Sequence, residues 1–164
     1  MKPLAFIGVC LLILCNCQPI ENKVEFDKEA VVNSVNTMFE DFFNDIKAEG
    51  LIAEFKYLDR SEDFFWVPPG YNSALDYDSV RVIIESNARA YRLIEYQWDD
   101  LKIYPLSEEI VNYTGIVNCS MTDTSGIKTT ISLIESGVLI KRGDGWKYLS
   151  GQTRVLSTSE SIQY

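Results

Sequence analysis

Residues 137–156 read Gly137-Val138-Leu139-Ile140-Lys141-Arg142-Gly143-Asp144-Gly145-Trp146-Lys147-Tyr148-Leu149-Ser150-Gly151-Gln152-Thr153-Arg154-Val155-Leu156. This pattern predicts two strands joined by a tight turn, because Asp144-Gly145 supplies residues that accept the positive φ of a hairpin. Alternate residues after the turn share one face of the strand: Trp146, Tyr148, Ser150, Gln152 and Arg154. Because that face is aromatic and then polar, it favours the lining of a partly wet cavity.

Length and composition indicate one folded domain. The chain has 164 residues, of which 46% are hydrophobic and 12% aromatic, enough to bury a substantial core. The formal net charge is -9, and lysines and arginines form no run. This charge argues against binding to nucleic acid and against attraction to an anionic membrane surface.

The N-terminus is typical of a targeting segment. Lys2 precedes an apolar run over residues 4–14, which is too short to span a membrane. The cysteines that follow resemble the cleavage and lipidation site of a bacterial lipoprotein, with Cys17 as the lipidated residue and Cys15 as the alternative. An ordinary secretory signal with incidental cysteines is the other interpretation. We expect removal of residues 1–16, a polar tether over 17–26, and a location at the bacterial cell envelope, facing the periplasm or the outer surface. The membrane contact is expected to be the lipid alone.

Cysteine and histidine counts limit the chemistry. With Cys17 lipidated, Cys119 is the remaining thiol of the mature domain, so an internal disulfide is excluded. Its apolar surroundings predict a small buried residue. The chain has no histidine, which argues against a zinc site, and no acidic loop has the spacing of a calcium loop. We therefore predict no metal and no cofactor.

Hydrophobic periodicity predicts helices first and strands afterwards. A long amphipathic helix begins after Asp27 and ends at Gly50. A short helix follows it, with Leu51, Ile52, Phe55 and Leu58 expected to point inward. A short strand over 64–67 ends at Pro68-Pro69-Gly70 and precedes a helix capped by Asp76 or Asp78.

The second half of the chain predicts a meander of long strands. The strands cover 93–104, with an interruption at Asp99-Asp100, then 111–121, 127–141 and the region after the turn at Asp144-Gly145. A shift in apolar parity predicts a bulge at Ser136-Gly137. We expect a single domain over 27–157 and a polar tail over 158–164.

This order of elements resembles the SnoaL-like branch of the nuclear transport factor 2-like superfamily. The most specific match is the closing hairpin over residues 138–148, and the resemblance covers most of residues 27–157. It implies an α+β fold in which N-terminal helices pack in the concave face of a strongly curved antiparallel sheet, giving a cone with a pocket. It also implies a possible homodimer, since related domains commonly associate through the outer face of the sheet.

The catalytic residues of this superfamily do not carry over. Enzymes related to steroid isomerases place a carboxylate base before the proline that ends the short strand, where this chain has Val67 or Pro68. Many SnoaL-like proteins carry a histidine in the last strand, where this chain has Ser150-Gly151-Gln152-Thr153. No catalytic residue is therefore assigned from the resemblance.

Aromatic residues give the strongest indication of a pocket, because tyrosine and tryptophan combine apolar area with a polar group. The candidate pocket residues are Trp66, Tyr96, Trp98, Tyr113, Glu135, Trp146, Tyr148 and Gln152. Glu135 is the best candidate for a base and Glu95 the second, although either can be an ordinary charged strand residue. The aromatics can equally form the core or a dimer interface.

Three functions follow, in this order of preference. The first is a lipid-anchored, non-enzymatic domain that binds a small, largely apolar molecule or an envelope protein. The second is a structural dimerisation domain. The third is an isomerase, cyclase or lyase that uses a pocket carboxylate, which must point into the cone within reach of a Tyr or Trp donor.

Overall fold

The computed structural model describes residues 26–161. Helix α1 (Lys28–Glu49) is followed by the 3₁₀ turn η1 (Leu51–Lys56), strand β1 (Phe65–Val67) and helix α2 (Tyr77–Ala90). The long strands come next: β2 (Tyr91–Pro105), β3 (Ile110–Asp123), β4 (Lys128–Arg142) and β5 (Gly145–Ser161). The predicted signal peptide, the lipidation site Cys17, the tether up to residue 25 and residues 162–164 of the tail lie outside the described residues.

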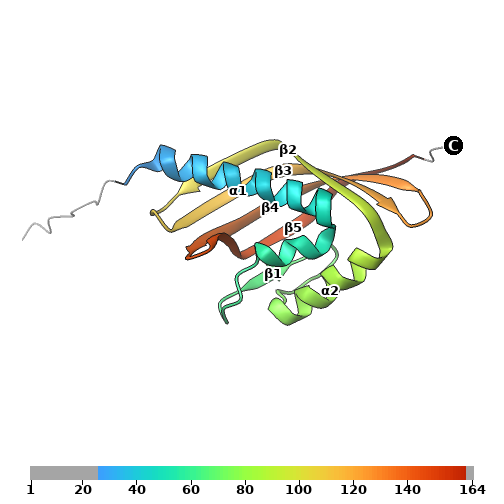
Figure 1. Cartoon of the computed structure of the whole chain (residues 1–164), viewed down its shortest axis with the longest axis horizontal. Coiled ribbons are helices and arrows are strands. Elements are labelled where there is room, and N and C mark those ends of the chain that lie inside the picture. The colour runs from blue at the N-terminus through green and yellow to red at the C-terminus, as the bar shows by residue number, and fades with distance from the viewer. Residues whose placement is uncertain (1–25, 162–164) are drawn as a thin grey trace, which may run out of the picture.

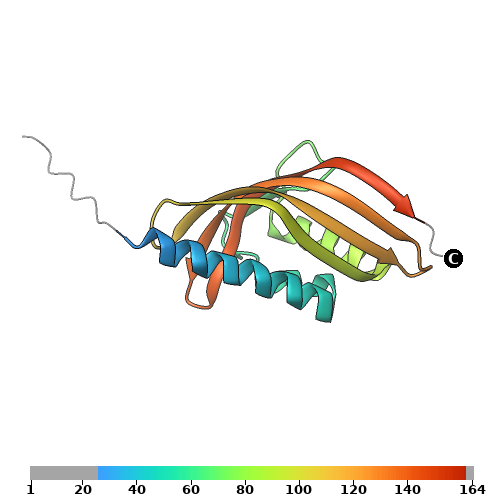
Figure 2. The same cartoon turned by 90° about the horizontal axis from the view of Figure 1, so that it is seen from above.

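The sheet is mixed and open. Strands β2 to β5 form an antiparallel meander, and β1 adds in parallel to β5, giving the order β1-β5-β4-β3-β2. Helix α1 lies along one face of this curved sheet (Figures 1 and 2). The turn η1 packs against both α1 and α2. This is the predicted α+β architecture, with β1 making the sheet mixed where an antiparallel one was expected. Between residues 26 and 161, none of the helices is long and apolar enough to cross a membrane.

Helix α1 begins and ends where its sequence predicts. The Asp27 carboxylate accepts a hydrogen bond from the Ala30 N–H at 2.9 Å, which caps the helix. Gly50 ends it with φ 81°, a conformation that glycine adopts without strain. The predicted apolar stripe faces the sheet. Its buried members are Val31, Val35, Met38, Phe39, Phe42 and Ile46.

Glycines on the concave face leave room for aromatic rings. A Cβ atom on Gly115 would lie 2.9 Å from the Trp98 ring, closer than atoms pack. A Cβ atom on Gly137 would lie 3.0 Å from the Tyr113 ring, and one on Gly151 would lie 2.5 Å from the Trp66 ring. Each ring therefore rests against backbone that a larger residue would push away.

The predicted bulge at Ser136-Gly137 is wrong. Strands β3 and β4 pair without a shift through this region. The nearest irregularity lies on β5 instead, where Leu139 pairs with Tyr148 but Val138 pairs with Ser150, so that Leu149 is an extra residue. The error arose because β4 carries apolar residues on both faces, which imitates a change of parity.

The bulge at Leu149 inverts the alternation of β5. Trp146 and Tyr148 are buried under the helices, but beyond Leu149 it is Thr153 that faces inward, while Gln152 is exposed. The strand also continues to Ser161, which pairs with Lys128, so its backbone extends into the segment expected to be a polar tail.

Replacing Gly115 with alanine is expected to destabilise the fold by about 1–3 kcal/mol, because the new methyl group would meet the Trp98 ring and the Asp100 carbonyl. Urea unfolding followed by circular dichroism measures this loss. Gly143→Ala is the control, since nothing lies within 4 Å of a Cβ atom at that position. Equal stability losses in the two variants would contradict the proposed packing.

Candidate functional site

A cavity of about 220 Å³ lies between the helices and the concave face of the sheet. Every helix and strand of the described chain contributes to its wall, and most of the lining side chains are apolar or aromatic. Two carboxyl groups interrupt this lining, those of Glu54 and Glu135. None of the lining residues, all within the described part of the chain, is a lysine or an arginine. The cavity is therefore apolar with a local excess of acidic groups.

Glu135 lies on β4 and is held by hydrogen bonds from two neighbouring strands. The Tyr113 hydroxyl donates to Glu135 Oε1 at 2.7 Å, and the Thr153 hydroxyl donates to Oε2 at 3.3 Å. Trp66 on β1 in turn donates its indole N–H to Thr153 Oγ1 at 3.0 Å. The network fixes the carboxyl group at the cavity wall, with donors on both oxygen atoms.

The surroundings of Glu135 change its ionisation. Burial raises the pKa of Glu135 to about 7, although the hydrogen bonds from Tyr113 and Thr153 favour the charged form and lower it. The carboxyl group is half-buried by surface area because it borders the cavity, but protein surrounds it on its other sides. Near neutral pH it is therefore present both as carboxylate and as acid, which is the condition for accepting and returning a proton.

Glu54 on η1 is the second carboxyl group of the cavity. Burial raises the pKa of Glu54 to about 8, with a smaller contribution from the negative charge of Glu135. Within residues 26–161 it has no hydrogen-bonding or ion-pairing partner. Its carboxyl group is therefore mostly protonated at neutral pH and free to contact a molecule in the cavity.

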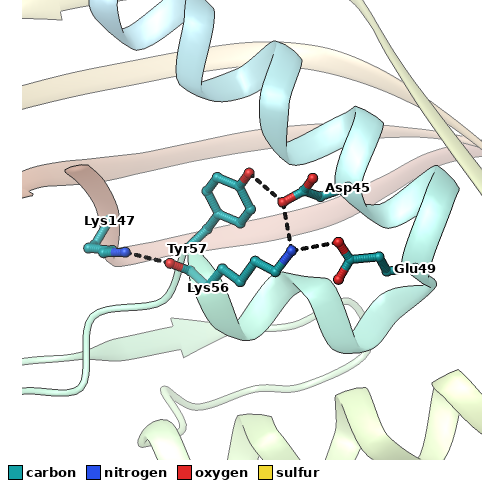
Figure 3. Close-up of polar contacts among 5 residues, drawn as sticks. All are labelled: Asp45, Glu49, Lys56, Tyr57 and Lys147. Atoms are coloured by element: carbon teal, nitrogen blue, oxygen red, sulfur yellow. Dashed lines mark hydrogen bonds and ion pairs between the residues drawn. The ribbon is translucent and has the colours of Figure 1, made fainter. Parts of the chain in front are cut away.

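Polar contacts anchor the segment that carries Glu54 (Figure 3). The Lys56 ammonium group donates to Asp45 at 3.0 Å and to Glu49 at 2.7 Å, both on α1. The Tyr57 hydroxyl donates to the same Asp45 oxygen at 3.0 Å. Lys147 of β5 donates to the Lys56 carbonyl oxygen. These contacts tie η1 to α1 and β5, which sets the position of Glu54 at the cavity wall.

Glu54 was not among the residues predicted from the sequence, because only the apolar residues of the short helix were expected to point inward. In a 3₁₀ helix, residues three apart point in the same direction, so Glu54 follows buried Leu51 inward. A single charged residue in the apolar run Leu51-Ile52-Ala53-Glu54-Phe55 was the available signal. Ile52, which was expected to point inward, is 47% exposed.

The structure divides the predicted pocket residues into three groups. Trp66, Tyr96, Glu135 and Tyr148 line the cavity. Tyr113, Trp98 and Trp146 belong to the surrounding core. Tyr113 holds Glu135, and Trp146 donates to Ser34 of α1 at 3.0 Å. Gln152 does not line the cavity, because the bulge at Leu149 turns it to the opposite face.

Two further residues singled out in the sequence have clear positions. Glu95, the second candidate for a base, lies away from the cavity and pairs with Lys47 at 2.7 Å. Cys119 is buried, as predicted, and borders the cavity. Burial raises the pKa of the Cys119 thiol to about 12, so a thiolate nucleophile is not available near neutral pH. Residues 26–161 contain no group of three or more acidic or cysteine side chains placed to hold a metal ion.

Comparisons with known proteins identify the fold through structure alone. No family model matches the sequence, and no curated protein matches it. Among solved structures, a protein proposed to be a scytalone dehydratase from Novosphingobium aromaticivorans superposes with a TM-score of 0.68 at 14% identity. That match covers 83% of this chain and 91% of the other.

Two other solved structures are similar to the same extent. The LinA-type3 hexachlorocyclohexane dehydrochlorinase from Novosphingobium barchaimii matches with a TM-score of 0.64 at 12% identity, covering 83% of this chain and 93% of its own. A nuclear transport factor 2-like superfamily protein from Salmonella enterica matches with a TM-score of 0.65 at 10% identity, covering 84% and 95%. The chain therefore has the nuclear transport factor 2-like fold, the cone-shaped α+β architecture that the sequence predicted.

Proposed function

We propose that this chain is an enzyme of the isomerase or lyase kind, which moves a proton on a small, largely apolar molecule bound in the cavity. The observation that carries the proposal is the position of Glu135, a carboxyl group in an apolar cavity with a Tyr113 hydroxyl at 2.7 Å. This is the arrangement that an enzyme of this kind was expected to require.

Glu135 acts as the base in this proposal. Its carboxylate takes a proton from a carbon atom of the substrate and becomes a carboxylic acid, while the electron pair of the broken C–H bond moves toward a neighbouring carbonyl or expels a leaving group. Tyr96 and Tyr148 line the same cavity, and burial raises the pKa of both hydroxyls well above their usual range. They therefore stay protonated and can donate to an oxygen atom of the substrate.

The names of two structural neighbours are compatible with this chemistry. One is a dehydrochlorinase and the other is proposed to be a dehydratase, names that denote elimination reactions. With identities of 12% and 14%, these similarities establish the fold, and the proposal of proton transfer rests on the cavity of this chain.

Binding without chemistry, the function ranked first from the sequence, is the second candidate. It is favoured by the residues at the usual catalytic positions, because β1 ends at Val67 and is followed by Pro68, where related isomerases carry a carboxylate. The inner face of β5 near the cavity presents Thr153 and no histidine. The two candidates share the cavity and differ in whether Glu135 exchanges a proton with the bound molecule.

We also propose that a lipid on Cys17 holds the domain at the bacterial cell envelope. Support comes from the sequence, in which the apolar run over 4–14 leads into the cysteines and a polar tether reaches the start of α1. Cells fed an alkyne-tagged fatty acid are expected to label the wild type and not a Cys17→Ser variant. Labelling of that variant, with loss of label in Cys15→Ser, would move the lipid to Cys15.

Replacing Glu135 with glutamine is expected to lower proton exchange at carbon by about 10²–10⁴-fold, since the amide cannot accept the proton. Small monocyclic ketones incubated in deuterium oxide report this exchange by NMR. Glu95→Gln is the matched control, because Glu95 pairs with Lys47 away from the cavity. In the wild type the exchange rate should rise as pH increases through about 7, where Glu135 ionises. Ligand binding without any exchange in the wild type would favour the second candidate.

The pH dependence of stability tests the ionisation of Glu54. Its pKa is about 8 in the folded chain against 4.5 for an unperturbed glutamate, so the folded state binds more protons between these values. The contribution of Glu54 to the free energy of unfolding is therefore fully present below about pH 4.5 and is lost as pH rises from there through about 8. In Glu54→Gln, the decrease in the free energy of unfolding over this pH range should be smaller by about 2–5 kcal/mol. Denaturant unfolding at several pH values measures it, and an unchanged slope in the variant would show that Glu54 is solvated.

A further inference from the structure

The cavity is lined by two acidic residues and, within the described chain, by no basic residue that could neutralise them. Glu54 and Glu135 both line it, and its other lining residues, which all belong to the described chain, are uncharged. Glu135 has hydroxyl donors, but the Glu54 carboxyl group has no partner within residues 26–161. Glu54 is half-buried by surface area because it borders the cavity, but protein surrounds it on its other sides. A carboxyl group without a partner in such a site is costly to ionise, so it favours a ligand that supplies the missing positive charge.

We infer that the substrate of the proposed reaction carries a protonated amine on a small apolar body, with the ammonium group bound by Glu54 and the aromatic rings of the cavity. The inference rests on the proposed function, because it assigns a substrate class to the same cavity. Glu54 is then a binding residue, and Glu135 remains available for the proton transfer.

Aromatic rings near the carboxyl groups suit a cation. Trp66 and Tyr148 both line the cavity, and their rings lie 5.6 Å apart at 85°, edge to face. The negative face of an aromatic ring attracts an ammonium group, most strongly where water is excluded. Phe42 and Tyr96 also line the cavity and supply apolar contact for the body of the ligand.

The size of the cavity limits that body to about one ring. An apolar cavity of about 150 Å³ accommodates benzene, and this cavity has about 220 Å³. A single ring with a short aminoalkyl group therefore fits, whereas a fused ring system of drug size would not.

The negative charge of the protein and the acidic residues of the cavity favour a cationic ligand over an anionic one. The protein has a net charge of -9, which attracts cations to the cavity and repels anions over distances of several ångströms. Inside the cavity an anionic ligand would meet two acidic groups and no lysine or arginine among the lining residues of the described chain. A carboxylate or phosphate ligand is therefore disfavoured both on approach and when bound.

Three probes of nearly equal shape test the inference: benzylamine, benzyl alcohol and benzoate. Their binding to the folded protein is measured by isothermal titration calorimetry at about pH 7.5, where benzylamine is protonated. We expect benzylamine to bind at least about tenfold more tightly than benzyl alcohol, and benzoate to bind least. Release of protons on binding benzylamine, seen as a heat that depends on the buffer, is expected as well, because the ammonium group favours ionised Glu54.

Two matched variants test whether Glu54 is the residue that makes the cavity prefer benzylamine. Glu54→Gln should reduce the affinity for benzylamine about tenfold and leave that for benzyl alcohol nearly unchanged, whereas Glu95→Gln should change neither. Benzyl alcohol binding as tightly as benzylamine would overturn the inference, as would an unaltered preference in Glu54→Gln or no binding of benzylamine at about 10 mM.

Failure of the inference and failure of the proposed function are distinguishable. If amines are not preferred but ketones exchange deuterium through Glu135, the substrate class is wrong and the proton transfer stands. If amines are preferred through Glu54 but no aminoketone exchanges deuterium, the cavity binds cations and the enzymatic proposal fails.

Discussion

Phe39 of α1 joins the helix to the sheet, and the arrangement of the whole domain depends on this contact. Its ring centroid lies 5.2 Å from those of Trp98 and Tyr113 and 6.1 Å from that of Tyr148, all edge to face. Because the three rings come from β2, β3 and β5, a single side chain couples the helix to most of the sheet. Such aromatic pairs contribute about 0.5–1.5 kcal/mol each beyond the area they bury. The glycines beneath the rings permit this packing, since a Cβ atom at Gly115 or Gly137 would displace them.

Tyr148, one of the rings that Phe39 contacts, also lines the cavity that contains Glu54 and Glu135. Neither carboxyl group serves the stability of the fold, because burial raises the pKa of both and ionisation above those values is costly. Conflict between a residue and its environment is common at functional sites, where the rest of the structure supplies the compensating stability. Here the compensation includes the anchor of η1, in which Lys56 bridges Asp45 and Glu49.

Local patterns in the sequence were sufficient to predict most of the helices and strands of the fold. The stripe of α1, its cap at Asp27 and the alternation of β3 each depend on neighbours within a few residues, and all are found in the structure. The interruption at Asp99-Asp100 is also present, as a register shift between β2 and β3. The bulge was misplaced because strand pairing determines which strand carries the extra residue, and Val138 is apolar although it lies on the outer face.

The candidate site was predicted in part. Glu135 was identified from its apolar neighbours, and Trp66, Tyr96 and Tyr148 from their chemistry, because these properties are visible in a single segment. The position of Glu54 in the cavity and the position of Gln152 outside it could not be predicted from the sequence. Each depends on how segments that are distant in the chain pack against one another.

By itself, the sequence determined the order of the elements, their apolar faces and the absence of histidine, because these follow from residue identity and short-range periodicity. Tertiary structure decided that Glu54 and Glu135 line one cavity, and that Leu149 turns Thr153 inward and Gln152 outward. The physical reason is that burial and charge coupling depend on atoms far apart in the chain, and only the folded sheet and its helices bring them together.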